Sequence, residues 1–112
     1  MNLSLFNFQN APCGLFVFDS NWRLVAANQT LATMLGQTID DLFGKSLDDL
    51  LTSANRLMFH MQVMSMLHLH GHVEEISIHL LGADGVGVPV LFNAVRREHN
   101  GETQTECVVL RV

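Results

Sequence analysis

The chain has 112 residues, 48% of them hydrophobic and 15% charged, and a formal net charge of -5 at pH 7. This length suits one domain with a single core, the hydrophobic content excludes a disordered segment, and the negative charge argues against nucleic acid or an anionic membrane as the main partner. Because so few charged side chains cannot solvate the whole surface, we expect a partner subunit or another part of the same protein to cover one apolar face.

The first predicted element is a short amphipathic lead-in over residues 1–10, either a helix or an extended arm. It lacks the positive region that begins a signal peptide. Pro12 ends it by pushing Ala11 out of helical geometry. We expect a homodimer in which this lead-in and the valine-rich last strand meet a second copy. The predicted interface residues are Leu3, Leu5, Phe6, Phe8, Val108 and Leu110.

A β-hairpin is predicted next. Leu15–Phe18 and Arg23–Ala27 are rich in aromatic and β-branched residues, and the turn residues Asp19-Ser20-Asn21 lie between them. Asn28 is placed to cap a helix over Gln29–Leu35, which Gly36 ends. The hairpin is therefore expected to lead directly into the first helix.

Two short helical turns and one long helix follow. The turns begin at Thr38 and Ser46, each with acidic residues at the positive end of the helix dipole. The longest helical candidate covers Ser53–His70 and is ended by Gly71. No stretch approaches the roughly 18 apolar residues of a membrane-spanning helix.

Three more strands are predicted over Val73–Leu81, Val86–Val95 and Thr105–Val112. Ala83-Asp84-Gly85 and Asn100-Gly101 supply hairpin turns between them. Since no helix separates these strands, they must form an antiparallel meander. The order of elements predicts an α+β fold, in which helices pack on one face of a five-stranded antiparallel sheet.

The ordered set of segments over residues 11–112 resembles a PAS domain, the sensory module of bacterial signalling proteins. The likeness lies in GLFVFD with its polar turn, RLVAANQTLATMLG, the DDLFGKSLDDLL block, an amphipathic helix and the meander with its ADG and NG turns. Arg56–Leu81 is similar to PAS modules of bacterial diguanylate cyclases, PP2C-type serine phosphatases and hybrid sensor histidine kinases. The resemblance implies the profilin-like PAS fold, in a domain that relays a signal to an output domain of the same full-length protein.

The helix over Asn55–His70 suggests a ligand pocket, because it is apolar on two sides. At about 100° per residue, Leu57, Met61 and Met64 share one face, while Phe59 and Val63 share another. In a PAS fold one face would line a chamber between helices and sheet. The predicted pocket residues are Asn28, Leu35, Leu57, Met61, Met64, Ile76, Ile78 and Phe92. The alternative is a packed core without ligand, in a domain that only dimerises or docks.

No cofactor is required by the sequence, although haem or a small organic ligand is compatible with it. Some PAS sensors bind haem through a His on the equivalent helix, so His60 is the candidate for a haem-based gas or redox sensor; the alternative is a surface His. Arg96, at a strand end, is expected to be poorly placed to reach a ligand. The segment TSANRLMFH lacks the cysteine of flavin-binding LOV domains, which argues against a flavin adduct.

Neither a metal site nor an active site is predicted. His68, His70 and His72 are spaced so that they diverge on a helix end, and the aspartate pairs lie at helix starts. Cys13 and Cys107 are isolated in the sequence, and two isolated cysteines are typical of reduced thiols in a cytosolic protein. We therefore predict a cytoplasmic regulatory module that is not itself an enzyme.

Overall fold

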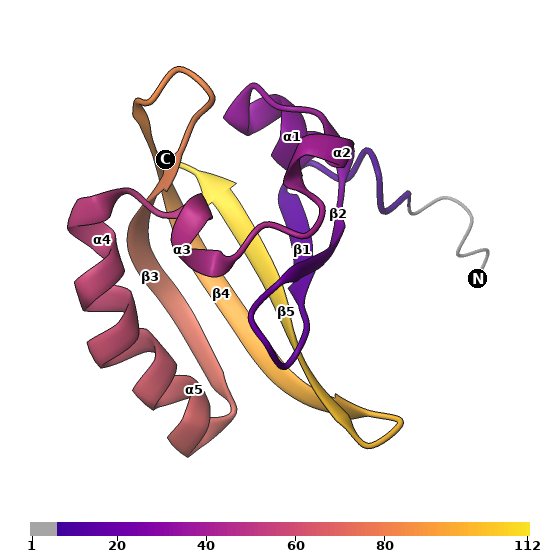
Figure 1. Ribbon diagram of the computed structural model, residues 1–112, viewed down its shortest axis with the longest axis vertical. Helices are drawn as coiled ribbons and strands as arrows, with labels where there is room; N and C mark the ends of the chain where they lie inside the picture. Colours follow the sequence, from indigo (N-terminus) through magenta and orange to yellow (C-terminus); the bar gives the residue numbers. More distant parts are fainter. Residues whose placement is uncertain (1–6) are drawn as a thin grey trace.

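A computed structural model describes residues 7–112 of the chain. Five strands form one antiparallel sheet in the order β2-β1-β5-β4-β3 (Figure 1). The strands are β1 (Gly14–Phe18), β2 (Leu24–Ala27), β3 (His72–Leu81), β4 (Gly87–His99) and β5 (Glu102–Arg111). The central strand, β5, is therefore also the last one, and it pairs with the first.

The helices cover one face of this sheet (Figure 1). They are α1 (Gln29–Leu35), α2 (Ile39–Leu42), α3 (Leu47–Leu50), α4 (Ser53–Met58), the π-helical η2 (Phe59–Val63) and α5 (Met64–His70). This arrangement confirms the predicted α+β fold with helices on one side of an antiparallel sheet. In the described part of the chain, no helix is both long and apolar enough to cross a membrane.

The helix ends follow their local sequence. Asn28 caps α1 by accepting a hydrogen bond from the Leu31 N–H, and Gly36 ends it in the left-handed conformation at φ 68°. Thr38 begins α2 with a capping box. The Thr38 hydroxyl accepts a hydrogen bond from the Asp41 N–H, and the Asp41 carboxylate accepts one from the Thr38 N–H.

The β4–β5 hairpin is longer than the sequence predicts. Asn100 and Gly101 form the predicted tight turn, with φ values of 53° and 80°. Pairing continues up to this turn, so β4 runs to His99 and β5 begins at Glu102. The polar composition near the turn concealed these strand ends, which project beyond β1.

A bulge in β3 changes which of its residues face the core. Val73 pairs with Ala94 and Ile76 pairs with Phe92, so two glutamates oppose the single residue Asn93. Glu75 has a φ of 57°, and its N–H donates to the Asn93 side-chain oxygen at 3.1 Å. Because of the extra residue, Val73 is buried on the same side as Ile78, which simple alternation excludes.

Candidate functional site

Aromatic side chains fill the space where the sequence predicts a ligand chamber. Phe16, Phe18, Trp22, Phe59 and Phe92 form a continuous cluster with ring centroids 5.4–6.5 Å apart. Edge-to-face and tilted contacts of this kind stabilise a packed core. Of the predicted pocket residues, the structure brings Leu35, Ile78 and Phe92 into this core, with Met64 and Ile76 half-buried against it.

The prediction that Leu57 and Met61 face inward is wrong. Their side chains are 68% and 67% exposed, on the outside of the helix. The buried residues are instead Phe59, Val63 and Leu67, which recur every four positions across η2. A π-helical turn holds more residues than the 3.6 assumed from sequence, so the inward face shifts. The regular spacing of those three apolar residues was the available signal.

Asn28 is fully buried, but its polar atoms are occupied by the protein. Its side-chain oxygen accepts from the N–H groups of Leu15 and Leu31, both at 3.0 Å. Its amide donates to the carbonyls of Phe8 at 2.9 Å and Cys13 at 3.0 Å. Asn28 therefore joins the lead-in, β1 and α1, and it has no group turned toward a ligand.

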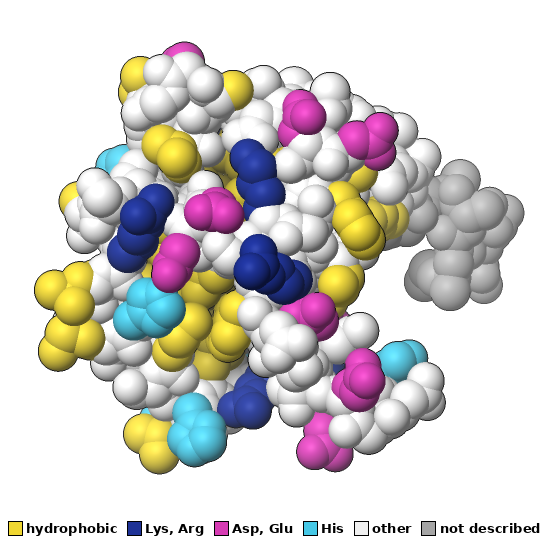
Figure 2. Space-filling view, viewed as in Figure 1, with side chains coloured by type: hydrophobic (Ala, Val, Ile, Leu, Met, Phe, Trp, Pro, Cys, Tyr) yellow, Lys and Arg dark blue, Asp and Glu magenta, His cyan; other side chains and the backbone are white. Residues whose placement is uncertain are grey.

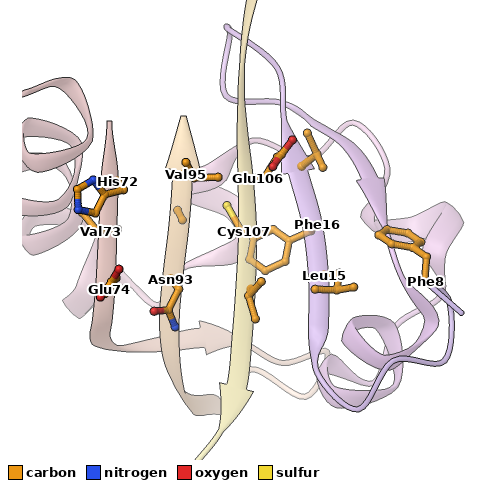
Figure 3. A pocket seen from close by; sticks show the side chains of 13 residues that line it. Phe8, Leu15, Phe16, His72, Val73, Glu74, Asn93, Val95, Glu106 and Cys107 are labelled. Carbon is orange, nitrogen blue, oxygen red and sulfur yellow. The ribbon is translucent and has the colours of Figure 1, made fainter. Parts of the chain in front are cut away.

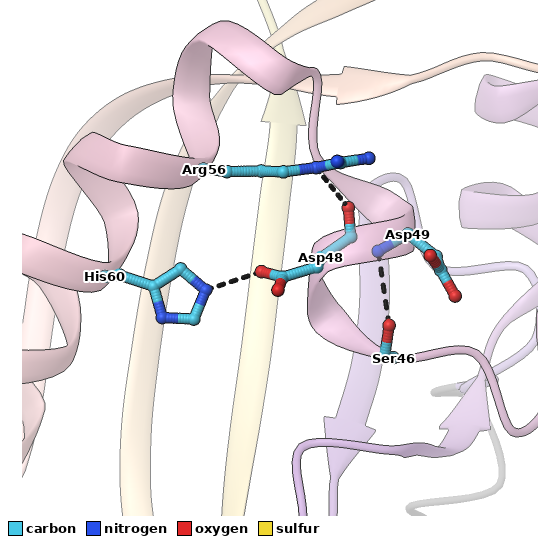
Figure 4. Close-up of polar contacts among 5 residues, drawn as sticks. All are labelled: Ser46, Asp48, Asp49, Arg56 and His60. Carbon is cyan, nitrogen blue, oxygen red and sulfur yellow. Dashed lines mark hydrogen bonds and ion pairs between the residues drawn. The ribbon is translucent and has the colours of Figure 1, made fainter.

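His60, the candidate haem ligand, contacts the Asp48 carboxylate through Nε2 at 2.5 Å (Figure 4). Both side chains are about half exposed, at 44% and 51%. Arg56 Nε donates to the Asp48 carbonyl at 2.9 Å and ties α4 to α3. Among residues 7–112, no three His, Cys, Asp or Glu side chains are arranged to hold a metal ion. The pair therefore links α3 to η2.

The face of the sheet opposite the helices carries a groove of about 620 Å³ (Figure 3). Apolar side chains of three neighbouring strands line it: Leu15 and Val17 from β1, Val108 from β5 and Val95 from β4. Two predicted interface residues, Phe8 and Val108, lie here. Leu110 is 47% exposed, and Leu3, Leu5 and Phe6 lie outside the described residues.

Cys107 is also among the residues that line this groove, although its side chain is buried in the core. Burial raises the pKa of Cys107 well above its ordinary value, and the neighbouring Glu106 carboxylate raises it further. The thiol is therefore protonated and unreactive, so the groove offers shape and apolar contact rather than a nucleophile.

A second cleft, of about 320 Å³, lies between α5, the β1–β2 turn and the β4–β5 hairpin. Figure 2 shows hydrophobic side chains in the hollow beside α5. We call it the α5 cleft; its lining residues are Asp19, Ser20, Trp22, Met64, Leu67, His68, Arg96, Thr103 and Thr105.

Arg96 is a lining residue that sequence reasoning set aside. Its Nη1 lies 3.3 Å from His68 Nδ1, and its backbone N–H donates to the Gly71 carbonyl at 2.8 Å. Alternation along β4 could have found it, because Phe92 and Ala94 share its face. Of the residues predicted to form a pocket, only Met64 lines this cleft.

Comparisons with known proteins agree with this architecture. A sequence profile for the PAS fold matches residues 8–112. The phosphoserine phosphatase RsbP of Bacillus subtilis is 33% identical over 101 residues, which cover 90% of this chain and 25% of that protein. The chain thus spans about a quarter of the length of this relative.

Solved structures show the same fold at low sequence identity. The PAS domain of a protein from Colwellia psychrerythraea superimposes with a TM-score of 0.85 at 15% identity, over 94% of this chain and 90% of that one. A PAS domain from a two-component sensor histidine kinase gives 0.79 at 14% identity, over 93% and 88%. From the profile match across nearly the whole chain, we conclude that this protein belongs to the PAS-fold family of sensory domains.

Proposed function

We propose that this domain is the regulatory module of a cytoplasmic bacterial signalling protein, and that it acts through the open face of its sheet. In this proposal a second copy of the chain docks on the groove, and the domain relays its state to an output domain of the same full-length protein. The groove lined by Leu15, Val17, Val95 and Val108 is the observation that carries the proposal.

The chemistry of this groove supports a protein partner. Apolar side chains occupy its floor, and Glu74, Glu106 and His72 lie among its lining residues. An apolar centre with a polar rim is typical of a protein interface. A second copy of the chain is the occupant favoured here, because isologous dimers use the same patch twice. The proposal assigns Leu3, Leu5 and Phe6 to this interface, since they precede Phe8 in the chain.

The position of β5 supports a relay. This strand lies between β1 and β4, with Val108 in the groove and its neighbours Cys107 and Val109 buried in the core. A change in packing on either face therefore acts on the same strand, which ends the described fold. A coupling of about 1–3 kcal/mol between the two faces would suffice to switch an output domain.

Catalysis is assigned to that output domain and not to this one. RsbP, the relative reported above, is named a phosphatase, and the chain corresponds to a quarter of it. We infer by analogy that the activity under control resides outside residues 7–112. A binding site for a small molecule and a docking face for a partner are both compatible with this role.

Light scattering on the purified chain tests the proposed interface. We expect the wild type to be dimeric at about 100 µM and Val108→Glu to be monomeric, because the carboxylate would be buried in the apolar groove. Phe43→Glu is the matched control, since Phe43 is 64% exposed and does not line the groove. A monomeric wild type, or a Val108→Glu variant that remains dimeric, would refute the proposal.

A further inference from the structure

We propose that the α5 cleft binds a small monocarboxylate and that the Arg96 guanidinium holds the carboxylate group. One consequence of this inference, that the ligand would be an input signal, rests on the proposed regulatory function. Binding itself is a property of the cleft and is tested separately.

The surroundings of Arg96 leave it available for a ligand. Its neighbour Arg97 lies on the other side of β4 and donates to the Glu106 carboxylate at 2.9 Å. Arg96 has no carboxylate at ion-pair distance within residues 7–112, and the one hydrogen-bond partner of its side chain there is the ring nitrogen of His68. A guanidinium carries five N–H donors in a fork that matches a carboxylate, so most of its donors remain free.

Next to this charge, the cleft offers apolar and hydroxyl groups. Trp22, Met64 and Leu67 supply apolar surface, and Thr103 and Thr105 supply hydroxyl groups. Its volume of about 320 Å³ is at the lower end of the range for small-molecule sites. A ligand with a carboxylate at one end and a short aliphatic or aromatic body matches this combination.

The conformation of Trp22 is an independent observation at the same place. Its φ of 58° lies in the left-handed region, which is costly for a large side chain. Contacts with Phe18, at 5.5 Å between ring centroids, and with Phe59, at 6.5 Å, hold the indole over the core. Strain of this kind is concentrated at functional sites, and here it places an aromatic wall in the cleft.

Asp19 limits the class of ligand. Its carboxylate also lines the cleft, where its Oδ1 accepts hydrogen bonds from the N–H groups of Asn21 and Arg23, both at 2.9 Å. This oxygen is satisfied by the turn, and its negative charge would repel a second acidic group on the ligand. We therefore expect monocarboxylates to bind in preference to dicarboxylates.

Trp22 provides the readout, because it is the only tryptophan in the chain. Hexanoate and benzoate are titrated into the purified chain while Trp22 fluorescence is recorded, and 1-hexanol serves as the uncharged analogue of hexanoate. Arg96→Gln removes the charge, and Arg97→Gln is the matched control on the opposite face. We expect saturable binding of at least one carboxylate to the wild type and to Arg97→Gln, and affinity at least about tenfold weaker for Arg96→Gln and for 1-hexanol.

The outcomes separate this inference from the proposed function. No saturable change with either carboxylate, or equal affinity in Arg96→Gln and the wild type, overturns the inference. If Arg96→Gln does not fold, Arg96→Lys keeps the charge without the fork, and unchanged affinity in that variant likewise counts against it. The Val108→Glu variant should still bind the carboxylate. A wild type that is monomeric but binds a carboxylate refutes only the docking proposal. A wild type that is dimeric but binds neither carboxylate refutes only this inference.

Discussion

Asn28 and Leu15 hold each other through two hydrogen bonds. The N–H of Leu15 donates to the Asn28 side-chain oxygen at 3.0 Å, and the N–H of Asn28 donates to the Leu15 carbonyl at 2.9 Å. One residue at the end of β2 therefore satisfies both backbone groups of a residue in β1. The same side chain also begins α1, so the hairpin and the first helix are fixed together.

Replacing Asn28 with Ala should destabilise the domain by about 3 kcal/mol, because buried donors and acceptors would lose their partners. Urea denaturation followed by circular dichroism measures this loss. Asn21→Ala is the control, since that residue is exposed in the β1–β2 turn, and it should change stability by less than about 0.5 kcal/mol. Similar stability of the two variants would mean that the Asn28 hydrogen bonds contribute little.

The altered helix face at η2 predicts opposite results at two nearby positions. Phe59→Ala should cost about 3–5 kcal/mol, because it removes a fully buried ring from the aromatic cluster. Met61→Trp, which would overpack an inward-facing site, should instead change stability by less than about 0.5 kcal/mol, since Met61 is exposed. Thermal unfolding of both variants tests the register. A strongly destabilised Met61→Trp would restore the regular α-helical assignment.

Gly14 has no room for a side chain. A Cβ at this position would lie 2.6 Å from a Val109 methyl group and 3.1 Å from Leu31 Cδ1. Gly14→Ala should therefore cost about 1–3 kcal/mol through overpacking. Adding Val109→Ala removes the nearest atom, so the double variant should be more stable than the sum of the two single effects predicts. Strict additivity in chemical denaturation would argue against a direct clash.

Asp41 should make the domain less stable in acid. Hydrogen bonding by the Thr38 side chain, and then by the Thr38 backbone N–H, lowers the pKa of Asp41 from its ordinary value, with a smaller effect from Lys45. The pKa of Asp41 is lower in the folded state than in the unfolded state. Its contribution to the stability of the fold is therefore complete above the ordinary pKa and is lost as the pH falls through the folded-state pKa. Carboxyl NMR titration should show the Asp41 pKa rising in Thr38→Ala and rising less in Lys45→Gln. A larger rise in Lys45→Gln would reverse the order of causes.

Sequence predicts the parts of this fold that depend on local chemistry. Asn28, Gly36 and the Asn100-Gly101 turn each impose their own backbone geometry, so the element order and the antiparallel sheet follow from them. The β3 bulge and the π-helical turn could not be predicted in the same way. Both insert a residue so that distant side chains, such as Val73 and Phe59, can pack in one core.

The candidate site, too, is predictable from the sequence only where it depends on local chemistry. Val108, predicted from the valine-rich last strand to meet a second copy, lies in the groove on the open face, and its part in a dimer stays a prediction. The chamber was misplaced, because its filling by Phe16, Phe59 and Phe92 depends on contacts between remote segments. The sequence predicts that Arg96 lies at a strand end, poorly placed to reach a ligand, whereas β4 continues to His99 and Arg96 lines the α5 cleft.

The widened turn at Phe59–Val63 also sets a constraint on how the chain can change in length. Deleting one residue there would leave a regular α-helix with its flanking turns in nearly the same orientation, because the wide turn absorbs the extra residue. Deleting a residue of α5 before His68 would instead rotate the residues beyond it by about 100°. His68 would then move away from Arg96, and the α5 cleft would lose one wall. Related chains that keep this arginine should therefore lose a residue at Phe59–Val63 rather than in α5.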